Sequence, residues 1–127
     1  MEIKVYSEVD EDNLFDMMKK EGAEWEDYWG DSNRDKYKTA LSNSITFLSY
    51  DEDELCGYVR CRDDDGFGIY IYDLLVKKSK RGNNIGRALM ESVCSVFPNN
   101  RVYVMSDVDD YYKKHGYRRE GSIFEVK

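Results

Sequence analysis

The chain has 127 residues, enough for one domain with a buried core, and we expect residues 1–127 to form that single domain. Apolar residues make up 41% of the sequence and aromatic residues 14%, which excludes a disordered chain. The net charge of −7 argues against nucleic acid as a direct partner, because phosphate backbones are bound by basic surfaces.

The sequence also shows no signal for a membrane or an extracellular location. No apolar run approaches the length of a transmembrane helix, and the N-terminal MEIKVYSEVDED has no apolar signal-peptide core. The three cysteines are an odd number and form no CxxC pair, as is typical of free thiols in a reducing compartment. We therefore expect a cytoplasmic protein that has no membrane partner.

In chain order, the first predicted elements are one strand and two helices. Alternating residues indicate a strand at 3–7, and apolar residues at helical spacing indicate a helix at 8–20 that Gly22 would cap. An acidic and aromatic segment follows at 21–31. Ser32 or Asn33 is a suitable N-cap for a second, short helix that ends near Leu41.

The second half of the chain is predicted to be richer in strands. Strands are expected at 44–50, 55–62 and 67–76, and the last two are joined by a hairpin turn at Asp63–Gly66. A helix at 83–97, a strand at 101–105, a helix at 107–115 and a final strand at 122–126 complete the chain. This order predicts an α/β (α+β) fold in which helices pack on a mixed sheet.

The strongest functional signal is the stretch 74–90, LLVKKSKRGNNIGRALM. A strand ends at Val76, a Gly- and Asn-rich loop follows, and an amphipathic helix begins near Ile85. Unpaired N–H groups converge at a helix N-terminus, and the helix dipole favours an anion there. The cations around this point are Lys77, Lys78, Lys80, Arg81 and Arg87. These residues predict a phosphate-binding site.

The same stretch resembles the acyl-CoA loop of the GNAT superfamily of N-acyltransferases. The signature of that loop is Arg or Gln, two residues, Gly, one residue, then Gly or Ala. Asn84 replaces the first signature Gly, and Asn is the non-glycine residue that best tolerates positive φ. An ordinary strand–loop–helix connection with a solvated basic turn is the alternative interpretation. The pattern is matched by Arg81, Gly82, Ile85, Gly86 and Leu89.

A second stretch, 108–117 with the sequence VDDYYKKHGY, resembles the C-terminal pattern of the same family. That pattern is Ala, two residues, Phe-Tyr, one residue, Lys, one residue, Gly-Phe. Tyr112 falls on the family's Tyr, which often protonates the departing thiolate; the alternative is an aromatic residue on the core face of its helix. The family commonly has an Asn seven residues before this Tyr, but Met105 stands there, so Ser106 or Asp107 would have to anchor pantetheine instead.

The resemblance implies the GNAT fold, a mixed central β-sheet with helices on both faces, and acetyl-CoA as acyl donor without a metal. It implies an N-acetyltransferase in which a primary amine attacks the thioester directly in a ternary complex. A non-catalytic GNAT-fold module that senses CoA thioesters and regulates a protein partner is the alternative. Whether the chain forms a homodimer stays open. The expected cofactor-binding residues are Leu75, Val76, Arg81, Gly82, Asn83, Asn84, Ile85, Gly86 and Arg87.

Asp73 is the candidate catalytic base, three residues before Val76, where many family members carry an acid near the amine. An Asp inside a strand is locally unfavourable, so a function or a structural partner should explain it. It would act through a water or attract the ammonium; a purely structural Asp is an equally good interpretation. The acids at Glu24, Glu26 and Asp27 are further candidates, although a solvated loop explains them better. With the aromatic residues among them they favour a cationic acceptor.

Overall fold

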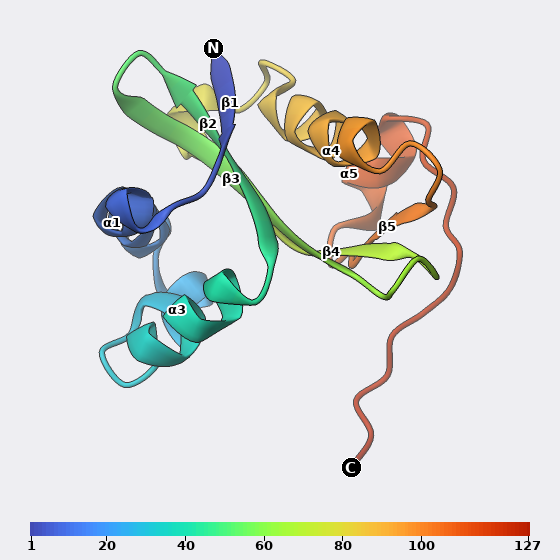
Figure 1. The fold of residues 1–127 in the computed structure, drawn as a ribbon, viewed down its shortest axis with the longest axis horizontal. Helices are drawn as coiled ribbons and strands as arrows, with labels where there is room; N and C mark the ends of the chain where they lie inside the picture. The colour runs from blue at the N-terminus through green and yellow to red at the C-terminus, as the bar shows by residue number, and fades with distance from the viewer.

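A five-stranded mixed sheet forms the centre of the molecule (Figure 1). The computed structural model describes residues 1–127. The strands lie in the order of the chain, β1 to β4 are antiparallel neighbours, and β4 and β5 are parallel. Such a parallel pair needs a long crossover connection, which here contains a helix. The strands are β1 (Glu2–Val5), β2 (Ile45–Asp51), β3 (Glu54–Asp63), β4 (Ile69–Val76) and β5 (Val102–Val104).

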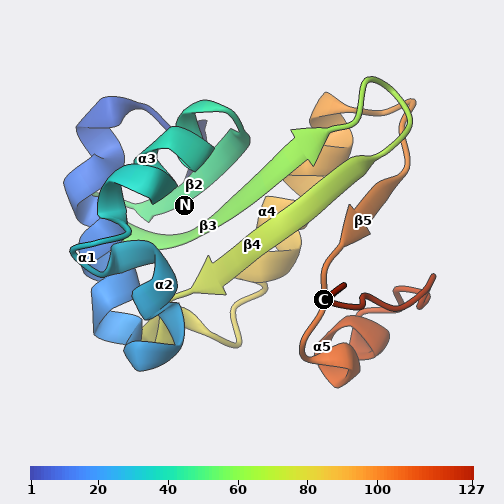
Figure 2. The same cartoon turned by 90° about the horizontal axis from the view of Figure 1, so that it is seen from below.

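Helices cover both faces of this sheet (Figures 1 and 2). One face carries α1 (Glu11–Glu21), α2 (Glu26–Trp29) and α3 (Arg34–Ser42), and the other carries α4 (Ile85–Val96) and α5 (Asp109–Lys114). Short 3₁₀ turns occupy Glu8–Asp10, Ala23–Trp25 and Lys78–Lys80. The predicted mixed sheet with helices on both faces is thereby confirmed. None of the helices combines the length and the apolar character needed to cross a membrane.

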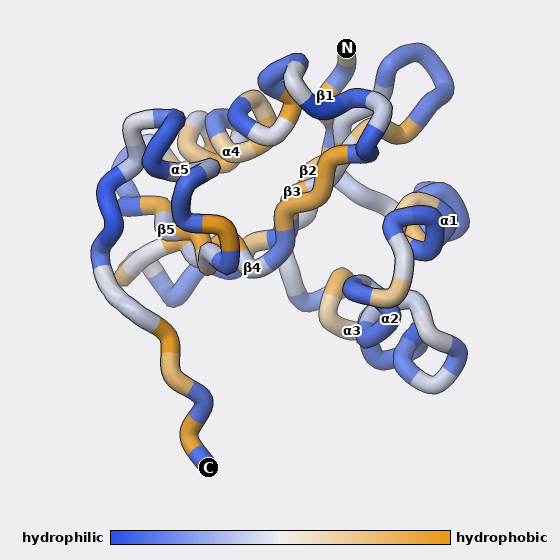
Figure 3. Tube along the Cα trace, turned by 180° about the vertical axis from the view of Figure 1, so that it is seen from behind, coloured by the Kyte–Doolittle hydropathy of each residue, from blue (hydrophilic) through white to orange (hydrophobic).

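Two hydrophobic cores, one on each face, hold the helices to the sheet. The predicted apolar stripe of α1 is buried in the first core, where it meets α3 and β3. In α4 the predicted stripe is buried in the second core except for Val96, which is 54% exposed at the helix end. Hydrophobic segments therefore concentrate on the central strands and the inner side of α4 (Figure 3).

A β-bulge in β4 decides which face of the sheet its residues occupy. Tyr72 has no partner on β3, so the strand contains one extra residue at this point. Regular alternation would place residues 71, 73 and 75 on one face. Instead Ile71 belongs to the second core, whereas Leu75 belongs to the first. The bulge therefore turns Asp73 toward the α1–α3 face of the sheet.

The predicted strand at 122–126 is wrong. The chain after α5 contains no helix or strand and makes no backbone hydrogen bond beyond Tyr117. Ile123, Phe124 and Val126 are 72%, 84% and 95% exposed, and the segment runs away from the body of the molecule (Figure 1). Its residues have strand propensity, but a strand forms only against a partner, and β5 pairs with β4 alone.

Candidate active site

The free edge of β4 is the first part of the site. β4 and β5 pair only over residues 69–71, and the last bond between them runs from the Met105 N–H to the Ile71 carbonyl at 3.0 Å. Beyond this point the two strands diverge (Figure 2). Leu75 and Val76 pair with β3 on one side but have no strand on the other. Their outer edge can therefore bind an extended ligand through main-chain groups.

The start of α4 is the second part of the site. Asn84 is the N-cap of α4 and lies in the left-handed region with φ 60° and ψ 23°, so it takes the conformation that the sequence predicted for it. The first helical bond runs from the Ala88 N–H to the Asn84 carbonyl at 3.0 Å. The N–H groups of Ile85, Gly86 and Arg87 before it therefore have no partner within the helix, as anion binding requires.

The predicted cations around this helix start are mostly held in ion pairs. The Nζ atom of Lys77 is 2.7 Å from a carboxylate oxygen of Glu54, and the hydrogen bond between them lowers the pKa of Glu54. Lys80 pairs with Asp51 and Glu54 of the same β2–β3 turn at 3.4 and 3.6 Å. Arg87 pairs with Glu91 one turn along α4 at 2.8 Å. The amides, rather than these side chains, are the free anion donors.

Arg81 joins three elements. Its Nε atom donates to the Val76 carbonyl at 2.9 Å, and its Nη2 atom pairs with the carboxylate of Glu21 at the end of α1. Sequence reasoning did not identify Glu21. The available signal was a carboxylate at a helix C-terminus, where the dipole disfavours negative charge.

Two adjacent phenols of α5 lie in different surroundings. A Cβ atom built on Gly86 would be 2.5 Å from the Tyr111 hydroxyl oxygen and 3.6 Å from Val76 Cγ2, so the Tyr111 hydroxyl lies over the start of α4. Tyr112, which matches the family motif, is half-buried against the second core. Burial raises the pKa of Tyr112 to about 12. The structure thus brings the hydroxyl of Tyr111 to the start of α4 and packs the ring of Tyr112 on the second core.

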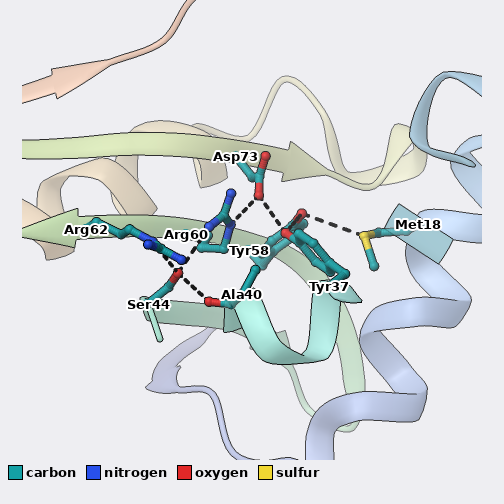
Figure 4. A network of polar contacts seen from close by, with 8 residues as sticks. All are labelled: Met18, Tyr37, Ala40, Ser44, Tyr58, Arg60, Arg62 and Asp73. Carbon is teal, nitrogen blue, oxygen red and sulfur yellow. Dashed lines mark hydrogen bonds and ion pairs between the residues drawn. The ribbon is translucent and has the colours of Figure 1, made fainter. Parts of the chain in front are cut away.

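Asp73 is the centre of a buried polar network (Figure 4). Its side chain is 2% exposed, and its Oδ2 atom accepts hydrogen bonds from Arg60 Nε at 2.5 Å and from the Tyr37 hydroxyl at 2.6 Å. Because Tyr37 gives its one hydroxyl hydrogen to Asp73, the Tyr58 hydroxyl, 2.8 Å away, donates to Tyr37. Sequence reasoning missed Arg60; its signal was a cation within the apolar strand 55–61.

The electrostatics of this network keep the phenols protonated and the ion pair intact. Burial, with the charge of Asp73 as a second cause, raises the pKa of Tyr37 far above the ordinary range and that of Tyr28 to about 12. Burial, followed by the neighbouring Tyr37 and Asp73, likewise raises the pKa of Tyr58 far above the ordinary range. Burial opposes the charge of Arg60, but the hydrogen bond to Asp73 raises its pKa above the usual value. Arg60 therefore keeps its positive charge beside the Asp73 carboxylate, with which it forms an ion pair.

The segment between α1 and α3 forms an aromatic wall beside this network. Trp25 and Tyr28 are half-buried with ring centroids 5.5 Å apart, and Tyr28 stacks on Tyr37 at 4.5 Å. The acidic side chains of the same segment, Glu24, Glu26 and Asp27, are exposed. The wall thus has an aromatic inner side that touches the Asp73 network and an acidic outer side.

No group of three or more His, Cys, Asp or Glu side chains is arranged to hold a metal ion. The acidic residues 63–65 form the predicted hairpin turn, in which Asp63 Oδ1 accepts from the Gly66 N–H at 2.9 Å. A hollow of about 380 Å³ lies beside this turn, where β4 and β5 begin to separate. It is lined by Arg62, Asp63, Asp64, Tyr70, Tyr72 and Met105.

Known proteins share this architecture over the whole chain. A family model described as an acetyltransferase (GNAT) domain matches residues 10–127. A GNAT-family acetyltransferase from Streptococcus pneumoniae TIGR4 has a TM-score of 0.75 at 22% identity, with 99% of this chain and 98% of that chain covered. AAC(6')-Iy in complex with the bisubstrate analogue CoA-S-monomethyl-acetylneamine has a TM-score of 0.75 at 13% identity, with 99% and 97% covered.

The aminoglycoside antibiotic 6'-N-acetyltransferase AAC(6')-IG from Acinetobacter haemolyticus has a TM-score of 0.70 at 14% identity, with 100% of this chain and 98% of that chain covered. At these identities the three structures show a common fold. The family model adds a match over nearly the entire sequence, which includes the loop at α4 and the motif at α5. The chain therefore belongs to the GNAT family of acetyltransferases.

Proposed function

We propose that the protein is an acetyl-CoA-dependent N-acetyltransferase whose acceptor is a primary amine that attacks directly in a ternary complex. The observation that carries this proposal is the free edge of β4 at Leu75 and Val76, next to the partnerless amides at the start of α4. These two features can bind an acyl-pantetheine chain and a pyrophosphate, respectively, through the main chain.

In this proposal the cofactor is held mainly by backbone groups. Leu75 and Val76 meet the acyl and pantetheine part, and the amides from Arg81 through Arg87, including Gly82, Asn83, Asn84, Ile85 and Gly86, meet the pyrophosphate. The ion pairs of Lys77, Lys80 and Arg87 support this division, because they leave the amides as the freest donors. Acetyl-CoA supplies an activated acetyl thioester when it is bound.

Tyrosines of α5 would donate the proton that the departing thiolate needs. We assign Tyr112 as the donor to the departing thiolate, on the strength of its place in the motif. The location of the Tyr111 hydroxyl over Gly86 makes Tyr111 the second candidate. Both phenols have raised pKa values, chiefly because of burial, so both carry their proton at neutral pH.

On the acceptor side we assign Asp73 as the group that takes the amine proton through a water. Arg60 offsets its charge, so direct attraction of an ammonium by Asp73 is the weaker of its two roles. The aromatic wall and the exposed acids at 24, 26 and 27 favour a cationic acceptor. A structure with the same fold is named an aminoglycoside antibiotic 6'-N-acetyltransferase, which agrees with this acceptor class.

The second candidate function is a CoA-thioester sensor without turnover. Two observations favour it: Met105 stands where the motif has Asn, and Tyr112 is packed against the core. The test is to measure acetyl-CoA binding by calorimetry and then thiol release with a panel of polyamines, aminoglycosides and lysine peptides. Amine-dependent thiol release with an acetylated product by mass spectrometry supports the enzyme. Binding without release from any amine supports the sensor, and the absence of binding contradicts both.

A further inference from the structure

Glu21 is a buried carboxylate at a place where a helix disfavours one. It is the last residue of α1, next to unpaired carbonyl groups that repel negative charge, and its side chain is only 6% exposed. Lys19 and Lys20 just before it fit a helix C-terminus well. A buried charge is retained only with a partner, and the partner of Glu21 is Arg81, 60 positions along the chain.

Arg81 uses both sides of its guanidinium group for protein contacts. Nη2 pairs with Glu21, and Nε donates to the carbonyl of Val76, the last residue of β4. A planar guanidinium fixes its partners relative to each other, which a Lys ammonium does not. The side chain therefore ties the end of β4 to the loop that leads into α4.

The C-terminal end of α1, where Glu21 lies, is held in place by packing and by a hydrogen bond. The apolar side of α1 is buried in the first core, and the Trp29 indole N–H donates to the carbonyl of Gly22 at 3.1 Å. Glu21 thus holds Arg81 from a fixed point on the far side of the loop. Arg81, which belongs to the loop before α4, in turn contacts the end of β4 through the Val76 carbonyl.

We propose that Glu21 is a positioning residue of the cofactor cleft, which acts by holding Arg81 across the end of β4 and the phosphate-binding loop. This inference rests on the proposed function, because it assigns the ion pair a role in acetyl-CoA binding. It also gives the Arg81 side chain a structural role: the side chain organises the site and does not bind phosphate.

The variant Glu21→Gln gives opposite results for the two roles of the Arg81 side chain. If Arg81 is held for positioning, loss of the Glu21 charge loosens the cleft and raises the Kd for acetyl-CoA at least about fivefold, as expected for a hydrogen bond to a charged group. If the Arg81 side chain is a phosphate ligand, release from Glu21 lowers the Kd. Calorimetric titration of the folded variant with acetyl-CoA, checked by circular dichroism, distinguishes the two; an equal or lower Kd overturns the proposal.

The variant Arg81→Lys is a second test of the role of the Arg81 side chain. This position is half-exposed and tolerates substitution. A phosphate ligand would be largely replaced by Lys, which also binds phosphate. Lys cannot replace a guanidinium group that holds Glu21 and Val76 in fixed positions. If Arg81 has that role, we expect Arg81→Lys to bind acetyl-CoA as weakly as Arg81→Ala. The KM for acetyl-CoA should rise in both, while kcat at saturating acetyl-CoA stays within about twofold. Rescue by Lys would overturn the inference.

Glu91→Ala is the matched control, because it frees Arg87 from an ion pair beside the same helix N-terminus without touching β4. We expect no increase in its Kd for acetyl-CoA. An increase as large as that of Glu21→Gln would show that any loss of charge near the loop has this effect, and would overturn the specific role of Glu21. If the wild-type protein does not bind acetyl-CoA, the proposed function itself is contradicted. If the wild type binds acetyl-CoA and Glu21→Gln binds it equally well, only the role of Glu21 is contradicted.

Discussion

The Asp73 carboxylate is nearly inaccessible and accepts two hydrogen bonds, from Arg60 and Tyr37. A buried carboxylate with these partners stabilises the fold, and it can serve catalysis only if a water reaches it from the acceptor side. The two roles predict different consequences of substitution, because a structural ion pair affects the free energy of unfolding and a base affects the pH dependence of the rate.

We predict that Asp73→Asn lowers turnover at neutral pH more than it weakens acetyl-CoA binding. The variant also leaves Arg60 without its carboxylate, so the free energy of unfolding should fall by about 3 kcal/mol, the usual result of breaking a buried pair. Urea denaturation, calorimetry with acetyl-CoA and a pH–rate profile measure the three effects. A lower stability with an unchanged pH–rate profile would remove Asp73 from the catalytic residues.

The adjacent phenols of α5 permit a paired comparison. Tyr112→Phe is predicted to lower the rate at least about tenfold, with little change in acetyl-CoA affinity; this is a conservative expectation, because general acid catalysis typically contributes about 10²–10⁴-fold. Tyr111→Phe removes a hydroxyl from the same helix and is its matched control. Single-turnover rates and melting temperatures of both variants should be compared. A normal rate with a lower melting temperature in Tyr112→Phe, and a loss of rate in Tyr111→Phe, would transfer the proton-donor role to Tyr111.

At the scale of elements, two glycines, Gly57 on β3 and Gly86 on α4, permit close contacts with neighbouring elements. A Cβ atom at Gly57 of β3 would lie 2.8 Å from the backbone carbonyl oxygen of Leu75, with the side chain of Leu89 on α4 only 3.3 Å away. A Cβ atom at Gly86 would meet only the end of the Tyr111 side chain at that range. Gly57 is therefore restrained by backbone, whereas Gly86 is restrained by a side chain that can move.

This contrast predicts that Gly57→Ala and Gly86→Ala differ in stability. Gly57→Ala should reduce the free energy of unfolding by about 1–3 kcal/mol, because a fixed carbonyl and a packed helix must shift. Gly86→Ala should cost less, since only the Tyr111 hydroxyl has to move. Urea denaturation of both variants checks this order, and a larger loss for Gly86→Ala would contradict it.

A charged substitution tests whether the start of α4 binds an anion. Gly86→Glu places a carboxylate beside the partnerless amides, where it fills the anion site and repels phosphate. We expect acetyl-CoA binding to be abolished in calorimetry while circular dichroism shows a folded protein. Gly86→Ala serves as the uncharged comparison. Unchanged affinity in Gly86→Glu would show that the pyrophosphate does not bind at this helix start.

At the scale of the whole molecule, Asp10 ties the segment before α1 to the strands β1 and β2. It is 3% exposed, pairs with Lys4 of β1 at 3.1 Å, and accepts hydrogen bonds from the Tyr50 hydroxyl at 2.9 Å and the Ser7 N–H at 3.1 Å. Burial by itself would raise its pKa, but the hydrogen bonds from Ser7, Lys4 and Tyr50 lower it below the ordinary value. The ionised form therefore stabilises the folded state.

The sign of this pKa shift sets the pH dependence of stability. The contribution of Asp10 is fully present above the unfolded pKa of about 3.9 and is lost as the pH falls through the lower folded value. The difference in unfolding free energy between the wild type and Asp10→Asn should thus be constant from pH 7 to pH 5 and decrease below pH 4. Urea denaturation at several pH values tests this, and a difference that grows on acidification would contradict it.

The sequence by itself determined the features that depend on neighbouring residues. Hydrophobic periodicity located the five strands and four of the five α-helices to within a few residues, but it did not predict α2 and it predicted a strand at 122–126 that does not form. Gly22 at φ 108° and Asn84 at φ 60° adopt the positive φ values that these residue types tolerate. The anion-binding helix start after β4 was also predictable, because strand, loop and helix are contiguous. The family resemblance of the loop and of residues 108–117 was likewise readable without coordinates.

Only the tertiary structure decided the features that join distant segments. The bulge at Tyr72 reverses the alternation of β4 and turns Asp73 to the face on which Arg60 and Tyr37 meet it. The strand pattern at 122–126 found no partner: the segment pairs with no strand, although β5 leaves one edge of the sheet free, so strand propensity without packing did not form a strand. Glu21 and Arg81 lie 60 positions apart, and no local pattern encodes their pairing, because packing of α1 against the sheet brings them together.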